Sequence, residues 1–252
     1  PSHPLFVQDT GHLEATRADD LTVGDRVAAP RKLDLKSNDT LDIGYRESKA
    51  PNAVRLDLPD RWTPRLARLV GFIIAEGHVL RHDDNTADVR ITNQDDEILS
   101  DVSRALDDLG LTYTIDEPRT GTSASRVRCT ASEFVSFLEG LEPAILEGSG
   151  EQRVPEAVRT ASETTKREFL RAYVDGEGHV STKQRELTVA SMSPELLEGI
   201  RSLLLEFEVQ STLEQRSNGS YRLRISGNSF ERYVRRIVFV TDRKTGAAEA
   251  FE

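Results

Sequence analysis

The chain has 252 residues, which is long enough for two domains with separate cores or for one duplicated domain. It carries 43 acidic and 33 basic residues, and its net charge of −10 counts against nucleic-acid binding unless positive charge gathers on one surface. No apolar run approaches the roughly 18 residues that span a bilayer, and no signal peptide is visible, which counts against a membrane protein. The one cysteine, Cys129, excludes an internal disulfide and fits a cytoplasmic location.

The N-terminal part is expected to be a small β-rich module and a linker. Its first residue is Pro1 rather than Met, which suggests a trimmed or fragmentary chain. Turn signals at residues 9–11 and 23–25 separate apolar pairs, so residues 1–33 are predicted to form short strands. Residues 34–62 are polar and are predicted to be a linker that ends at Trp62.

An internal repeat follows. Thr63 and Pro64 form a helix start, and this helix is expected to run to Glu76. After it come paired strands at 79–81 and 87–92, a helix capped by Asn93, strands at 111–115 and 126–130, and a helix at 134–141 that begins with a capping box at 130–133. Residues 151–240 repeat this order after residues 63–150. The predicted fold class is therefore α+β, with a pseudo-two-fold duplicated αββαββα unit, mixed but mainly antiparallel sheets and a tail at 241–252.

One stretch within the repeat occurs twice, at residues 69–77 and 170–178. In each copy an apolar helical run ends in a carboxylate, Glu76 or Glu177, followed by a glycine. Small residues four positions apart share one helix face, so the two helix backbones are expected to approach unusually closely. The glycines, Gly77 and Gly178, are expected in the left-handed conformation. Two acids at neighbouring helix ends repel each other and the helix dipole, and a bound cation would relieve this repulsion.

The two copies resemble the paired motifs of the LAGLIDADG (DOD-type) homing endonucleases. The matching positions are Leu69, Gly71, Ile73, Ala75, Glu76 and Gly77 in the first copy and Leu170, Asp175, Glu177 and Gly178 in the second. The resemblance implies a site-specific endonuclease that hydrolyses both strands of double-stranded DNA, with Mg²⁺ bound by Glu76 and Glu177 as the catalytic acids. Because both motifs lie in one chain, it also implies a monomer that forms an internal pseudo-dimer.

The N-terminal module resembles part of the splicing domain of inteins. The matching pieces are His3-Pro4 and residues 18–25. In that family the histidine assists the acyl shift at the upstream splice junction, so His3 is expected to be a splicing-associated remnant. The family's nucleophile block and final His-Asn pair are absent, so the chain resembles an intein without its splicing termini. The alternative is a small β-module with a surface histidine. The excess of acids and the low lysine content suggest a halophilic archaeon as the source.

Basic residues near the second motif are candidates for catalysis. Inteins of this type carry a lysine where this chain has Gln152. The remaining candidates are Arg153, whose fixed charge prevents it from acting as a base, and Lys183, which is expected on the strand after the motif. Three further polar residues have other interpretations: His78 and His179 as DNA-facing or solvent residues, and Asp175 as a packing or hydrogen-bonding residue.

Arginine pairs on two predicted strands are the candidate DNA contacts. Strand alternation places Arg126 and Arg128 on one face, and Arg222 and Arg224 on the equivalent face of the second half. Arginine suits bidentate contact with guanine and contact with phosphate. The full set of candidates is Arg90, Arg119, Arg126, Arg128, Arg185, Arg216, Arg222 and Arg224.

For these arginines to bind DNA in spite of the negative net charge, the acidic excess is expected to lie away from them. The alternative is a solvated strand face with ordinary ion pairs. Two alternatives for the whole chain also stay open: a catalytically inactive DNA-binding or maturase-like protein, and part of a protein-splicing element.

Overall fold

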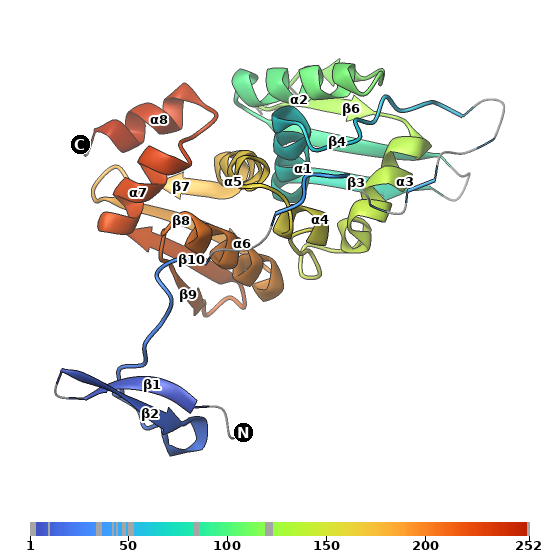
Figure 1. The fold of residues 1–252 in the computed structure, drawn as a ribbon. Helices are drawn as coiled ribbons and strands as arrows, with labels where there is room; N and C mark the ends of the chain where they lie inside the picture. Colours follow the sequence, from blue (N-terminus) through green and yellow to red (C-terminus); the bar gives the residue numbers. More distant parts are fainter. Residues whose placement is uncertain are drawn as a thin grey trace.

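The computed structural model describes residues 4–9, 11–33, 37–41, 43, 45–46, 49, 53–82, 86–118 and 123–250. Strands β1 (Pro4–Asp9) and β2 (His12–Arg17) pair as an antiparallel hairpin, and the 3-10 turn η1 (Ala18–Asp20) follows. The short strands expected at the N-terminus are therefore present. In Figure 1 the hairpin lies apart from the main body of the protein. No helix in the described ranges is long and apolar enough to cross a membrane.

The two halves of the main body each have the predicted order αββαββα. The first half consists of α1 (Pro64–Glu76), β3 (Gly77–Arg81), β4 (Ala87–Asn93), α2 (Asp96–Asp108), β5 (Thr114–Asp116), β6 (Ser125–Cys129) and α3 (Ser132–Leu141). The second consists of α5 (Glu163–Glu177), β7 (Gly178–Val180), β8 (Glu186–Ser191), α6 (Pro194–Glu206), β9 (Thr212–Gln215), β10 (Tyr221–Ser226) and α7 (Asn228–Arg236). The short helices η2 (Pro143–Leu146) and α4 (Glu156–Arg159) connect the halves. A further helix, α8 (Asp242–Glu249), occupies the segment that was expected to be a tail.

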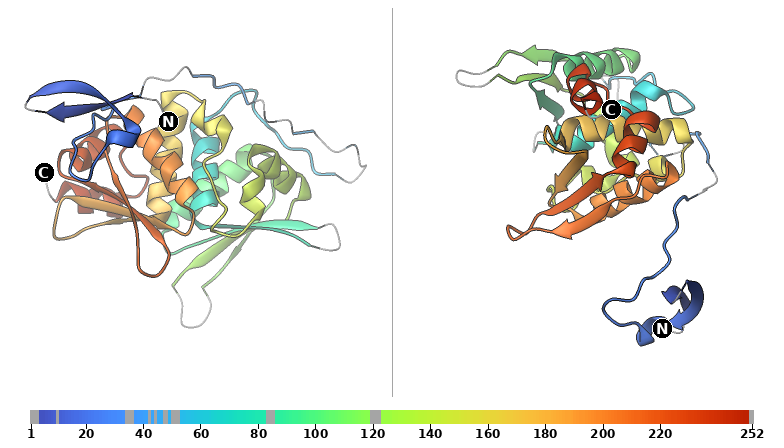
Figure 2. Two further views of the ribbon diagram at one scale, coloured as in Figure 1. Left: turned by 90° about the horizontal axis from the view of Figure 1, so that it is seen from below. Right: turned by 90° about the vertical axis from the view of Figure 1, so that its left-hand side faces the viewer.

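Each half contains one four-stranded sheet, with the strand orders β3-β4-β6-β5 and β7-β8-β10-β9. Every ladder among the described strands is antiparallel, so the expectation of mixed sheets was wrong. One face of each sheet carries buried apolar side chains such as Val89, Val127 and Leu223, which pack in the core with the helices. The other face, called the open face below, carries polar and charged side chains. The two sheets flank the central pair of α1 and α5, and the helices lie over the apolar faces of the sheets, away from the open faces (Figures 1 and 2).

Small residues let α1 and α5 pack with their backbones in close contact, as predicted. A Cβ atom added to Gly71 would lie 2.6 Å from the carbonyl oxygen of Phe169 and 2.9 Å from the Cβ of Ala172. A Cβ added to Gly176 would lie 2.5 Å from the Cβ of Ala75. No real side chain tolerates such distances, so each glycine is required by the neighbouring helix.

The glycines after the two helices serve a different purpose from the predicted one. Gly77 and Gly178 have φ angles of −76° and −82°, in the extended region rather than the left-handed one. The chain passes directly from each helix into a strand, and a Cβ on Gly77 would lie 2.3 Å from the carbonyl oxygen of Ile73. Lack of space, and not backbone handedness, therefore selects glycine at this position.

Helix caps were predicted with mixed success. Thr63 caps α1 as expected, because its side chain accepts a hydrogen bond from the amide of Leu66. Helix α2 begins two residues later than expected: Asp95 is its cap, and Asn93 instead accepts a hydrogen bond from the amide of Asp95. The predicted capping box of α3 is wrong, since its cap position holds Ala131, with no side-chain hydrogen bond.

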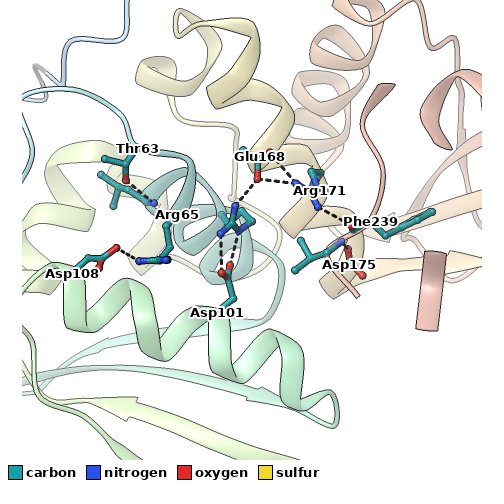
Figure 3. Close-up of polar contacts among 11 residues, drawn as sticks. Thr63, Arg65, Asp101, Asp108, Glu168, Arg171, Asp175 and Phe239 are labelled. Atoms are coloured by element: carbon teal, nitrogen blue, oxygen red, sulfur yellow. Dashed lines mark hydrogen bonds and ion pairs between the residues drawn. The ribbon is translucent and has the colours of Figure 1, made fainter. Parts of the chain in front are cut away.

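Ion pairs fasten the motif helices to their neighbours (Figure 3). Arg68 of α1 contacts Asp101 of α2 and Glu168 of α5, each at 2.6 Å, and therefore joins the two halves. Glu168 also accepts from Arg171, which in turn donates to the carbonyl of Phe239. Each half repeats one further pair between its motif helix and the next helix, namely Arg65–Asp108 and Lys166–Glu206.

The segment predicted to be a linker is packed against both halves where it is described. The Asp39 carboxylate accepts hydrogen bonds from the amide of Ser162 and the hydroxyl of Thr165, at the start of α5. Several of its apolar side chains pack against the core, among them Leu41, Ile43, Tyr45, Leu56 and Leu58. The described residues of this segment therefore form an ordered strap rather than a loose connection.

Substitution of Gly71 by alanine tests the close helix contact. Alanine normally stabilises a helix interior by about 1 kcal/mol relative to glycine, but the clash with the Phe169 carbonyl should outweigh this gain. We expect a net loss of roughly 1–3 kcal/mol in the free energy of unfolding, measured by urea denaturation. Gly246→Ala is the matched control, because Gly246 lies within helix α8 with no atom near its Cβ position, and it should be neutral or slightly stabilising. Equal effects from both substitutions would contradict the packing argument.

Candidate active site and nucleic-acid interface

The two motif carboxylates lie at the paired ends of α1 and α5, between the two sheets. A groove of about 510 Å³ is lined by both Glu76 and Glu177, together with His78, Gln152 and Ala190. A second groove of about 830 Å³ reaches Glu76 from the other side. Its walls include Thr92, Asn93, Asp95, Arg243 and Lys244. Thr92 and Ala190 belong to the open faces of β4 and β8, so the grooves connect the carboxylates with the open faces of both sheets.

The two carboxylates destabilise each other's charged forms. Burial and the nearby charge of Glu76 raise the pKa of Glu177 to about 7, and Lys244 only partly offsets this. Burial also raises the pKa of Glu76, although a hydrogen bond from the Asn93 amide favours its ionised form. A carboxylate pair of this kind favours a proton or a cation between its members.

Lys244 of α8 is a buried cation beside this pair that the sequence did not reveal. Its Nζ donates to the carbonyl oxygens of Val174, at 2.9 Å, and of Asp175, and so caps the last turn of α5. Asp175 in turn accepts from the Val240 amide and from the Thr241 hydroxyl at the start of α8. The hydrogen-bonding role expected for Asp175 is thereby confirmed. No motif marks Lys244; its only signal was the scarcity of lysine in the chain.

The donor set of the site suits a hard divalent cation. Glu76 and Glu177 supply carboxylate oxygens, the ligand type that Mg²⁺ prefers. The described residues contain no group of three or more His, Cys, Asp or Glu side chains arranged to hold a metal ion. A cation here would therefore complete its shell with waters or with oxygens of a bound ligand, as Mg²⁺ commonly does at phosphate-binding sites.

The other predicted catalytic residues do not reach the carboxylates. Arg153 points away and forms ion pairs with Glu142 and Glu195 at 3.6 and 3.5 Å. Lys183 is exposed in the turn between β7 and β8 rather than on a strand, and it lines neither groove. Gln152, in contrast, does line the groove that contains Glu177.

The open faces hold most of the predicted DNA-contacting arginines. Arg90 and Arg128 are direct cross-strand partners on β4 and β6, and Arg126 lies beside them. Arg222 and Arg224 lie on the open face of β10. Of the others, Arg185 pairs with Glu231 of α7, and Arg216 is exposed in the turn after β9. Arg119 and His3 lie outside the described residues.

Acidic residues lie among these arginines, so the expectation that the two would be segregated was wrong. Asp88 contacts both Arg90 and Arg128, at 2.7 and 3.1 Å. Glu214 pairs with Arg222, and Glu186 pairs with Arg224. The expectation assigned acidic and basic side chains to separate surfaces, whereas the pairing of adjacent strands places them side by side on the open faces. His78 and His179 are exposed on the same open faces, as expected.

Comparison with known proteins shows similarity in sequence and in fold. The chain is 23% identical to the DNA-directed RNA polymerase subunit Rpo1C of Methanocaldococcus jannaschii, over 99% of this chain and about 30% of that protein's length. The structure of I-DmoI in complex with DNA and Mn is similar, with a TM-score of 0.55 and 20% identity over 69% of this chain and 96% of that one. Full-length DUF199/WhiA from Thermatoga maritima is also similar, with a TM-score of 0.53 and 16% identity over 84% of this chain and 65% of that one.

The model of the LAGLIDADG-like domain family matches residues 63–142 and 164–238, which correspond to the two duplicated halves. The carboxylates that end the paired helices, Glu76 and Glu177, both lie within these ranges. This chain therefore belongs to the LAGLIDADG-like domain family.

Proposed function

We propose that this chain is a site-specific homing endonuclease that hydrolyses phosphodiester bonds in both strands of double-stranded DNA with Mg²⁺. One observation carries the proposal: the paired carboxylates open through two grooves onto two arginine-bearing sheet faces. A duplex laid across these faces would place its backbone at Glu76 and Glu177. The likeness to I-DmoI, whose structure contains DNA and Mn, supports both the substrate class and the use of a divalent cation.

The residues of the site have distinct roles in this proposal. Glu76 and Glu177 would hold the cation, which supplies an activated water and stabilises the leaving oxygen. Asn93 orients the Glu76 carboxylate through its amide. Lys244 holds the end of α5 and brings a positive charge next to the site. We assign Lys183 and Arg153 no part in the chemistry, because neither lines the two grooves.

We also propose that the chain derives from an intein of a halophilic archaeon and works in the cytoplasm as a monomer. The His3-Pro4 pair and the pattern at 18–25 support the splicing origin, as does similarity across 99% of the chain to part of a longer polymerase subunit. Its acidic composition supports the halophilic source. A buried free thiol at Cys129 suits a reducing compartment. Extensive packing of α1 against α5 within one chain supports the monomer.

Glu177→Gln tests the endonuclease proposal. The substitution removes one proposed cation ligand but none of the arginines proposed to contact DNA, so cleavage should fall by about 100-fold or more, while duplex affinity changes by less than about tenfold. A duplex enriched from a randomised library by the wild-type protein in EDTA serves as substrate, with Mg²⁺ added to start the reaction. Glu163→Gln, at the exposed start of the same helix, is the control and should cut at the wild-type rate. Binding without any wild-type cleavage would instead support the inactive DNA-binding alternative.

The pKa of Glu177, about 7, predicts how metal binding depends on pH. This pKa lies above the ordinary value of 4.5, so the folded protein favours the protonated carboxyl below pH 7. A divalent cation must displace that proton, so its affinity should rise by about tenfold per pH unit up to pH 7 and then level off. For the same reason the metal-free protein should lose stability as the pH rises from 4.5 to 7.

Calorimetric titration with Mg²⁺ in buffers of different ionisation enthalpy measures the protons released. We expect about one proton at pH 6 and close to none at pH 8.5, with the pH dependence lost in Glu177→Gln. Added salt should shift the transition to lower pH, because it screens the repulsion from Glu76. A pH-independent affinity in the wild-type protein would show that the two carboxylates do not share the cation.

A further inference from the structure

Four arginines of the two open faces, Arg126, Arg128, Arg222 and Arg224, are held in the same way. The Nε of Arg128 donates to Asp88, that of Arg126 to Thr92, that of Arg222 to Glu214 and that of Arg224 to Glu186. In each case the partner lies on the adjacent strand of the same open face. Within the described residues, no hydrogen bond or ion pair involves the Nη1 atoms of these four side chains. The inner edge of each guanidinium is therefore fixed, and its outer edge is free.

Two of these contacts are equivalent in the two halves. Arg128 pairs across the sheet with Arg90, and Arg224 pairs in the same way with Thr188. The acid in each case lies two residues before that cross-strand partner: Asp88 before Arg90, and Glu186 before Thr188. Position 90 opposes His78 on the first strand of its sheet, and position 188 opposes His179. The duplication has thus preserved an acid that holds the arginine of the third strand in each sheet order.

The contacts of Asp88 differ from ordinary surface ion pairs, which are mobile and worth little. Asp88 is fully buried beneath its partners, with 0% of its surface exposed. Its Oδ2 accepts from Nε and Nη2 of both Arg90 and Arg128 at 2.7–3.2 Å, and Nε2 of His82 is 3.6 Å away. Burial would raise the pKa of Asp88, but the two guanidinium groups lower it overall. A carboxylate enclosed in this way fixes the positions of its partners.

The free outer edge has a definite chemistry. Nη2 of Arg128 and of Arg222 also contacts the same acid, but each terminal nitrogen carries two hydrogens and only one of them faces that acid. Nη1 and the second hydrogen of Nη2 therefore present two parallel donors, which is the pattern that matches O6 and N7 of guanine in the major groove. A phosphate clamp needs positive charge, and a neighbouring carboxylate weakens it. An arginine held by an acid is therefore attracted less strongly to the phosphates of the DNA backbone, while its remaining N–H donors point in a fixed direction.

We propose that Asp88 and Glu186 are positioning residues that set sequence specificity, by aiming Arg128 and Arg224 at guanine bases in the two halves of the DNA site. This inference rests on the proposed binding of duplex DNA. It also assigns the acids on the open faces a purpose: they suppress binding to unrelated sequence while they orient the groups that read the correct one.

Selection from a randomised duplex library, in EDTA so that no strand is cut, tests the inference. Asp88→Asn and Glu186→Gln should each lower the preference for guanine by roughly 2- to 10-fold at one position, which corresponds to the cost of ordering one long side chain. The two affected positions should lie in opposite halves of the selected motif. Arg128→Lys should affect the same position as Asp88→Asn, and Arg224→Lys the same position as Glu186→Gln. Affinity for a scrambled duplex should rise in both acid variants, because a negative charge leaves the open face.

Glu139→Gln is the matched control. Glu139 lies on α3 and accepts from Nη2, rather than Nε, of Arg81. Its substitution should leave the selected motif and the affinity for the scrambled duplex unchanged. Acid variants that keep the wild-type motif and only bind every duplex more tightly would overturn the inference and identify the arginines as phosphate contacts. A wild-type protein that enriches no motif and binds no duplex would overturn the proposed function itself. Because Glu186 is only partly buried, its variant separates the effect from any folding defect at Asp88.

Discussion

The close approach of α1 and α5 is the constraint on which the rest of this structure depends. Gly71 and Gly176 allow the two backbones to touch, and the helices then end side by side. Each ends in a glutamate, so tight packing brings two like charges to one place. The packing supplies the energy that holds this arrangement, in which burial and the nearby charge of Glu76 raise the pKa of Glu177, and the like charges are the resulting strain. A cation between the carboxylates would remove that strain, and this is why the fold and the proposed chemistry are inseparable.

The sequence was sufficient for the features that repeat. Two copies of one helix pattern predicted the αββαββα order, the helix pair and the position of its carboxylates, because periodicity and small residues act locally. It was insufficient where a contact depends on distant parts of the chain. Lys244 lies on a helix after both repeats, and only the tertiary fold brings it to α5. The role of Gly77 was predicted wrongly because composition alone does not distinguish a left-handed glycine from one that merely lacks space.

The distribution of charge reconciles the negative net charge of the chain with the proposed binding of DNA. A net charge of −10 opposes general attraction to DNA, and part of the acidic excess lies among the arginines themselves. Such a surface binds unrelated duplex weakly, since its positive charge is neutralised locally. It still offers directed hydrogen-bond donors, since the acids occupy only the inner edges of the guanidinium groups. For a protein that must find one site among many, weak general binding with fixed donors favours discrimination over raw affinity.

The two halves resemble each other closely in their helices and strands but differ in the residues around the two carboxylates. Asn93 donates a hydrogen bond to Glu76, and Ser191 occupies the equivalent position in the second half. The side chains of Asn93 and Ser191 each accept a hydrogen bond from the backbone amide two residues later. Helix α8 follows only the second half, and its lysine caps only α5. Glu76 therefore has a fixed partner that favours its ionised form. Among the described residues no side chain donates a hydrogen bond to Glu177, and its pKa is raised to about 7. Two chemically identical ligands on a pseudo-symmetric frame thus have different surroundings, and a cation bound between them must displace the proton that the pair holds below about pH 7.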